Sequence, residues 1–285
     1  MMLRHVPGWQ SNSLTREWQL NSSWVISHYM DKLAHISRRG VLAGGAAVSA
    51  VAATGVSAPA LAARERSIFI ELFSSQGCSS CPPADAFMGE LIQRPDIVGV
   101  SMNVDYWDYL GWRDTLASAA FTRRQKEYAD RRGDGRVYTP QMVINGRAHA
   151  VGSHKQDVLS EVERQIAVPD TYFVSIEVSS RGGELHVDVA GGPTDRIIQS
   201  STVWVMSIEP KVSVEIRRGE NTGRTIDYFN VVRQMTPIGM WKGEAASFNL
   251  PKAQIVNKQN SMCVVVLQVD GGGPVLGCAE MKASA

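Results

Sequence analysis

The stretch Ser67-Ile-Phe-Ile-Glu-Leu-Phe-Ser-Ser-Gln-Gly-Cys78-Ser-Ser-Cys81-Pro82-Pro83 decides the fold of this chain. Its apolar first half is typical of a buried strand, and a short polar turn then leads to a Cys-x-x-Cys pair. Two prolines after the second cysteine fit the first turn of a helix, where a missing N–H costs little. The sequence therefore predicts a strand over 68–73 and two cysteines at the start of a helix.

This position makes a cysteine reactive. Unpaired amides and the helix dipole stabilise a thiolate at a helix N-terminus, so a pKa near 8.5 can fall to roughly 3.5–7.5. We expect Cys78, nearer the helix start and less buried, to be the nucleophile. Cys81 then resolves the mixed disulfide, and the disulfide itself is the only cofactor that this chemistry needs.

Two other interpretations of the Cys78–Cys81 pair stay open. In a secreted chain the pair can be a permanently oxidised structural bridge, and the protein a non-catalytic binding module. A cysteine pair also suits soft metals such as copper or zinc. Tetrahedral zinc needs four ligands, however, and the other two thiols lie far away in the sequence at a spacing untypical of zinc sites.

The first 62 residues have the pattern of an export signal. Arg38-Arg39 precedes an uncharged run rich in Ala and Gly, which ends in the small-residue site Ala60-Leu61-Ala62. The arginine pair indicates the twin-arginine route and a periplasmic or secreted protein. Residues 1–29 do not fit a signal, and a start at Met30 would give a compact one.

Composition excludes some partners. Without residues 1–62 the chain carries 24 Lys and Arg against 26 Asp and Glu, a formal charge of −2. A near-neutral chain without a basic stripe gives no support for nucleic-acid binding. No later run of 18 apolar residues follows, so we expect no membrane span after signal cleavage.

The rest of the chain divides into two parts with different patterns. Residues 63–169 alternate strand-like and helix-like runs, with predicted helices over 84–93, 116–131 and 156–167, which is typical of an α/β domain. From residue 170 to 285, short β-branched runs separated by Gly-rich turns predict a mainly-β, sandwich-like domain. We place the boundary near Pro169.

Thr139-Pro140 comes immediately before an apolar strand that ends at Asn145-Gly146. A strand, Cys-x-x-Cys, a helix and then Thr-Pro before a strand resembles the thioredoxin superfamily. The resemblance implies that Pro140 is cis and packs against the disulfide, and that the Thr139 backbone binds an extended substrate peptide. Without the resemblance, a trans proline at the start of a strand is the ordinary interpretation.

Glu71 alternates with Phe69 and Phe73 on the predicted first strand. In a central strand this side chain has no solvated face, which predicts a desolvated carboxylate with a raised pKa. The thioredoxin resemblance implies that such an acid takes the proton of Cys81. Glu71 lies seven residues before Cys78, one more than the commonest spacing, and an edge-strand or loop-facing glutamate is the alternative.

The aromatic run Asn103-Val-Asp-Tyr-Trp-Asp-Tyr-Leu-Gly-Trp-Arg-Asp114 follows the second predicted strand. Its Trp107 and Trp112 can line a substrate groove beside the cysteines, or simply pack the loop onto the fold. Near the C-terminus, Cys263 and Cys278 flank the turn at 271–273. We expect them on paired antiparallel strands, joined by a structural disulfide.

A closer resemblance covers most of residues 67–285. Four segments are similar to a secreted bacterial family that has a thioredoxin-like N-terminal part and is labelled domain of unknown function 1223. They are Glu71 to Asp85, Trp107 to Asp114, Phe121 to Gln125 and Arg218 to Gly223. That label supplies no activity. From the cysteines we therefore expect an exported thiol-disulfide oxidoreductase whose partners are protein thiols and disulfides of the cell envelope.

Overall fold

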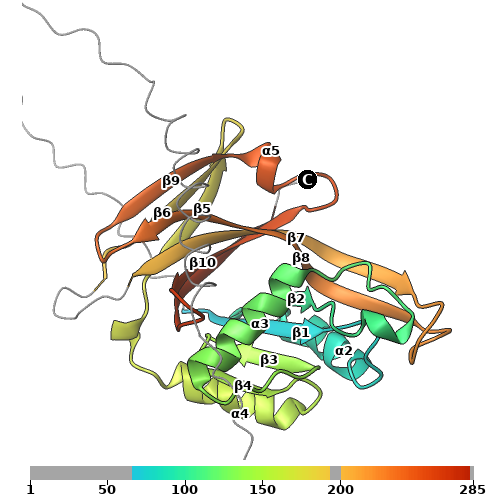
Figure 1. Ribbon diagram of the computed structural model, residues 1–285. Helices are drawn as coiled ribbons and strands as arrows, with labels where there is room; N and C mark the ends of the chain where they lie inside the picture. Colours follow the sequence, from blue (N-terminus) through green and yellow to red (C-terminus); the bar gives the residue numbers. More distant parts are fainter. Residues whose placement is uncertain (1–65, 193–199, 283–285) are drawn as a thin grey trace, which may run out of the picture. The chain divides into compact units, whose positions relative to one another are not determined.

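The computed structural model describes residues 66–192 and 200–282 (Figure 1). The predicted export signal over residues 1–62 lies outside this part, as does the alternative start at Met30. Within the described ranges, no helix is both long and apolar enough to cross a membrane.

The first half of the described chain alternates strands and helices, as its sequence predicts. It contains β1 (Ile68–Ser74), α2 (Pro82–Leu91), β2 (Ile97–Asn103), the 3-10 turn η1 (Asp108–Leu110), α3 (Ala119–Arg132), β3 (Gln141–Ile144), β4 (Ala148–Val151) and α4 (Lys155–Ile166). The three predicted helices are present within a few residues of their predicted ends. The short strand β4 was not predicted, because four half-buried residues leave little periodicity.

The second half is mainly β. It contains η2 (Asp170–Tyr172), β5 (Ile176–Arg181), β6 (Glu184–Val189), β7 (Ser201–Glu215), β8 (Thr225–Trp241), β9 (Ala246–Pro251), the short α5 (Lys252–Ile255), β10 (Met262–Val269) and β11 (Val275–Lys282). The β-branched runs over 201–208 and 212–216 predict two separate strands, but β7 runs unbroken through Pro210. A proline is tolerated there because β10 pairs with β7 only as far as Ile208, which leaves one edge of β7 open beyond it.

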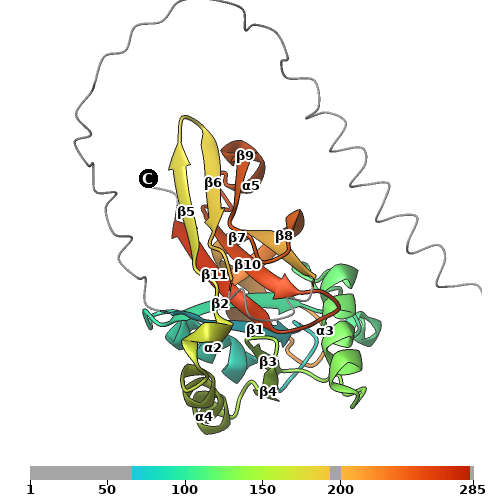
Figure 2. The same ribbon diagram turned by 90° about the vertical axis from the view of Figure 1, so that its left-hand side faces the viewer.

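Eight strands form one sheet in the order β11-β10-β7-β8-β2-β1-β3-β4, and β5, β6 and β9 form a second, three-stranded sheet. Alternate residues of β1 face opposite layers. Ile68, Ile70 and Leu72 pack with α2 and α4, whereas Phe69 and Phe73 pack with α3. Figure 2 shows α3 on one side of these strands and α2 and α4 on the other.

The predicted boundary near Pro169 does not interrupt the large sheet. β2 and β8 come from opposite sides of that position, and they pair at Ser101 and Val231. One hydrophobic cluster likewise combines Phe73 and Val100 with Val264. The three-stranded sheet packs against the large sheet, because its inward residues share a cluster with residues of β7 and β10. The two parts therefore share a sheet and a core.

Candidate functional site

Cys78 and Cys81 form a disulfide at the start of α2, with their Cα atoms 5.4 Å apart. The Cys81 N–H donates to the Cys78 carbonyl at 3.2 Å, and the Ala84 and Asp85 amides donate to the Cys81 carbonyl. Helix α2 thus begins directly after Cys81, as the prolines predict. Cys78 is 1% exposed and Cys81 0%, so exposure does not separate the two sulfurs as we expected.

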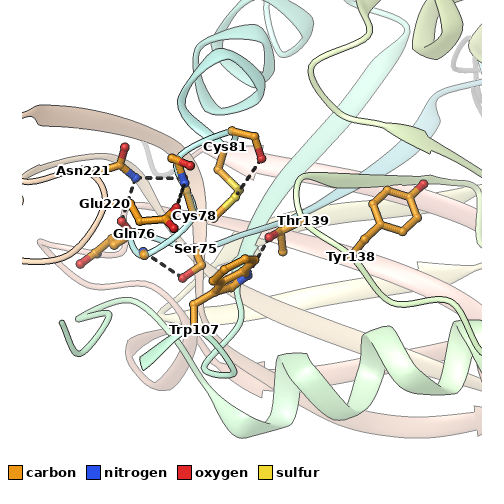
Figure 3. Close-up of a disulfide and its surroundings, with 12 residues drawn as sticks. Ser75, Gln76, Cys78, Cys81, Trp107, Tyr138, Thr139, Glu220 and Asn221 are labelled. Atoms are coloured by element: carbon orange, nitrogen blue, oxygen red, sulfur yellow. Dashed lines mark hydrogen bonds between the residues drawn. A yellow bond between two sulfur atoms is a disulfide. The ribbon is translucent and has the colours of Figure 1, made fainter. Parts of the chain in front are cut away.

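Trp107 links the disulfide turn to the Thr139-Pro140 segment (Figure 3). Its backbone packs against Gly77, where an added Cβ would lie 3.0 Å from the Trp107 Cβ. Its indole N–H donates to the Thr139 hydroxyl at 2.8 Å. The Thr139–Pro140 peptide bond is cis, which confirms that prediction. Pro140 and Ala84 of α2 both border Gly152, so the proline lies close to the first turn of the helix.

Gln76 fixes the turn before Cys78 to the aromatic loop. It is fully buried, and its side-chain oxygen accepts from the Trp112 indole at 2.8 Å. Its backbone N–H donates to Asp114 at 2.8 Å, and Asp114 also accepts from Asn103 at the end of β2. Both tryptophans of the loop therefore contact the site, Trp107 through Thr139 and Trp112 through Gln76.

Asp85 is a buried acid that our sequence interpretation missed. It lies four residues after Cys81, hence on the same side of α2, and is 1% exposed. Neither carboxyl oxygen has a hydrogen-bond partner at normal distance within the described ranges. Burial raises the pKa of Asp85 to about 8; the nearby Ser74 hydroxyl opposes this shift and the charge of Asp114 adds to it. The signal in the sequence is the spacing of four residues between Cys81 and Asp85, which is close to one helical turn.

Asp85 belongs to a buried polar cluster beneath the disulfide turn. Burial raises the pKa of Asp114, although hydrogen bonds from Asn103 and two backbone amides oppose the shift. Tyr228 of β8 is also buried, and both burial and the two acids raise its pKa. Burial of these three groups in one cluster disfavours their charged forms, and Asp85 is the one whose pKa comes closest to neutral pH.

Glu71 is buried in a central strand, so the edge-strand alternative is wrong. It lies on the other face of β1, however, away from α2. Its carboxylate pairs with Arg124 of α3, at 2.5 Å between Nε and Oε1, and accepts a hydrogen bond from the Tyr128 hydroxyl. A carboxylate held by a guanidinium on the α3 face is poorly placed to exchange a proton with Cys81.

The connection between β7 and β8 covers the disulfide turn. Asn221, 1% exposed, donates from its amide nitrogen to the Gln76 carbonyl at 3.0 Å and to the Cys78 carbonyl at 2.9 Å. Glu220 accepts from the Ser79 N–H at 3.2 Å. Figure 3 shows both side chains directed at the turn. Because these contacts span more than 140 residues, no local pattern in the sequence predicts them.

A family model described as "Protein of unknown function (DUF1223)" matches residues 69–268. The chain belongs to the DUF1223 family. Its fold is similar to the crystal structure of protein AGR_C_4864 from Agrobacterium tumefaciens, with 32% identity, a TM-score of 0.66, and coverage of 78% of this chain and 97% of that one.

A second solved structure, the hypothetical protein PH1083 from Pyrococcus horikoshii OT3, is 13% identical and has a TM-score of only 0.22. It covers 43% of this chain and 99% of that one, and a similarity this weak carries no argument. Among proteins with curated descriptions, none matches the chain significantly. The family and its related structure thus supply no activity for this DUF1223 protein.

The predicted disulfide between Cys263 and Cys278 is wrong for this DUF1223 protein. Their strands do pair, but Cys263 lies opposite Met281 and Cys278 opposite Val266. Cys263 packs into the cluster beneath the three-stranded sheet, and Cys278 packs against the cluster on the other face. Two thiols on opposite faces of a sheet cannot be joined. Burial raises the pKa of Cys263 to about 11, so this thiol is unreactive.

The structure brings Cys78, Cys81, Thr139, Pro140 and Trp107 into one site, and connects Trp112 to it through Gln76. Within residues 66–192 and 200–282, no three His, Cys, Asp or Glu side chains lie close enough to hold a metal ion. The site itself combines a disulfide with a buried acid, Asp85.

Proposed function

We propose that this DUF1223 protein exchanges disulfides with partner proteins through Cys78 and Cys81. The observation that supports it best is the Cys78–Cys81 disulfide at the first turn of α2, near the cis Thr139–Pro140 bond. The order strand, Cys-x-x-Cys, helix and cis proline before a strand also supports a thioredoxin-like assignment for residues 63–169. The predicted export signal would deliver the protein to a compartment where disulfides persist.

In the oxidising direction, a thiolate of the partner attacks the Cys78 sulfur. The Cys78–Cys81 bond breaks, and its electron pair leaves with the Cys81 sulfur. A second partner thiolate then attacks the partner's own sulfur in the mixed disulfide and releases Cys78. Two electrons pass from the partner to the pair, and the protons of the two partner thiols end on Cys78 and Cys81. The reducing direction is the reverse of these steps.

Asp85 takes the proton-transfer role that the sequence suggested for Glu71. It lies one helical turn beyond Cys81 and is buried with it. With a pKa of about 8, Asp85 is mostly protonated at neutral pH, so it can give a proton to the Cys81 thiolate as that group leaves. In the reverse direction the carboxylate form accepts the proton from the Cys81 thiol.

The partner would bind along the Thr139-Pro140 segment. An extended peptide there can pair with the Thr139 backbone, and Trp107 holds the Thr139 hydroxyl so that this segment keeps its position. The aromatic face of Trp107 supplies apolar contact area next to the disulfide turn.

Trapping with Cys81→Ser tests the proposal. The reduced variant is mixed with a disulfide-bonded peptide, and adducts are measured by mass spectrometry. Without the resolving thiol, a peptide adduct should accumulate on Cys78. The Cys78→Ser/Cys81→Ser variant is the control, and a yield no higher than in this control would exclude exchange through Cys78.

An inert structural bridge is the second candidate, and the burial of both sulfurs favours it. The reduction potential separates the two functions, because structural disulfides of secreted proteins lie below about −300 mV. Equilibration of the purified protein in graded thiol-disulfide buffers gives this potential. A value above that limit supports exchange, and a value below it supports a bridge that only holds the turn.

A further inference from the structure

We propose that Glu220 is a positioning residue that restrains the reactivity of Cys78 by holding the backbone N–H of Ser79. The inference rests on the proposed function and adds its regulation. Glu220 belongs to the β7–β8 connection, 141 residues after Ser79, and its Oε2 lies 3.2 Å from the Ser79 nitrogen. It thus contacts the backbone of the turn between the two cysteines.

The β7–β8 connection is fixed against this turn on both sides of Glu220, while Glu220 and Ser79 themselves are exposed. Asn221, the next residue, is buried and donates to the carbonyls of Gln76 and Cys78. On the other side, Gly219 has a φ of +82° and approaches Trp112. A side chain at this position would be strained, since only glycine adopts this conformation readily. Glu220 is therefore held between two anchored neighbours.

The amides near Cys78 are few. At most helix starts, free N–H groups of the first turn stabilise a thiolate. Here the first two helical residues are Pro82 and Pro83, which have no N–H, and the Cys81 N–H already donates to the Cys78 carbonyl. The Ser79 amide is thus one of the few remaining donors, and Glu220 occupies it.

The carboxylate acts against the Cys78 thiolate in two ways. It occupies a backbone donor of the disulfide turn, next to Cys78, and it adds a negative charge beside that turn. The Ser80 hydroxyl, 3.4 Å from the Cys78 sulfur, remains as a neutral donor. We therefore infer that Cys78 keeps a higher pKa than its helix-start position alone predicts as long as Glu220 holds the Ser79 amide.

Other titratable or charged side chains surround the turn and contribute to the same pKa. They are Asp85 of α2, Asp108 and Asp114 of the aromatic loop, Tyr228 of β8, and Arg224 of the β7–β8 connection. None of them is altered in the variants below, so their effects cancel in the comparison.

The test is a pH titration of the Cys78 thiolate by its ultraviolet absorbance in the reduced Cys81→Ser protein. The matching Cys78→Ser/Cys81→Ser protein is subtracted to remove the other thiols. Adding Glu220→Gln removes the charge and keeps the size of the side chain. We expect the thiolate fraction below the pKa to rise about threefold to tenfold, which is up to one pKa unit.

Glu215→Gln is the matched control, because this exposed carboxylate at the end of β7 pairs with Arg217 on the same hairpin. It should leave the titration unchanged. Glu220→Ala, which frees the Ser79 amide altogether, should shift it at least as far as Glu220→Gln. If both Glu220 variants titrate like the Glu215→Gln control, the proposal is wrong. The titration needs no partner, so it can fail or succeed independently of the trapping experiment.

Discussion

At the scale of single residues, Asp85 couples the site to pH. Its carboxyl group is buried, and burial raises its pKa to about 8, against 3.8 for an unperturbed Asp. The folded protein therefore keeps a proton that the unfolded chain releases between these two values. Folding stability should fall as pH rises through this window and level off above it.

Asp85→Asn tests this coupling, because asparagine fills the same space and does not titrate. We expect the free energy of unfolding of the variant to depend less on pH than that of the wild type, with the difference growing from about pH 4 to about pH 8. Urea denaturation at a series of pH values measures it. Parallel curves for the two proteins would show that Asp85 ionises normally in the fold.

At the scale of elements, the β7–β8 connection holds the disulfide turn in place through hydrogen bonds from Asn221. Asn221→Ala removes two hydrogen bonds and leaves the buried carbonyls of Gln76 and Cys78 without this donor. We expect a loss of about 1–3 kcal/mol in the free energy of unfolding. Alkylation of Cys78 in the reduced protein should also become faster, because the connection covers the turn less well.

Thr222→Ala is the control for this variant. The Thr222 hydroxyl donates to the Gly219 carbonyl within the same connection, but on its exposed side. Such a surface change should alter stability by no more than about 0.5 kcal/mol and leave the alkylation rate as it is. Equal behaviour of the two variants would mean that Asn221 does not hold the turn.

The elements themselves are largely predictable from the sequence. The three helices of the first half follow an apolar period of 3.6 residues, which is a local property, and their predicted ends lie within three residues of those found. The sequence does not reveal which strands pair with one another or in which register. The face of the sheet on which Cys263 and Cys278 lie depends on the register of β10 and β11, and a register error of one residue reverses it.

The residues of the candidate site likewise fall into those that the sequence predicts and those that it does not. Cys78, Cys81 and the cis Thr139–Pro140 bond are predictable because each belongs to a short motif. Glu220 and Asn221 are not, since only the folded β7–β8 hairpin brings them to the turn. The alternation of Glu71 with Phe69 and Phe73 correctly predicts a buried acid, but only the folded sheet shows that its face of β1 carries Arg124 rather than Cys81. Asp85 could have been predicted, because it lies four residues after Cys81 and therefore on the same side of the predicted helix.

At the scale of the whole molecule, the large sheet joins the two halves that the sequence separates near Pro169. The cluster between α3 and the sheet takes residues from β1 and β2 on one side of that position and from β7, β8 and β10 on the other. The site has the same dual origin, because the disulfide is in the first half and its cover is in the second. Removal of the second half would expose one face of β1 and β2 to water.

A fragment of residues 63–169 tests how far the first half depends on the second. Its Val100 and Met102 are fully buried in the complete protein, within a cluster that also contains Val264 and Val266 of β10. We expect the fragment to lack a cooperative thermal transition and to be digested rapidly by proteases, because it cannot bury this apolar face. The chain from residue 63 to its end is the control, and it should unfold cooperatively. A monomeric fragment that unfolds cooperatively would instead support an independent thioredoxin-like domain that ends near Pro169.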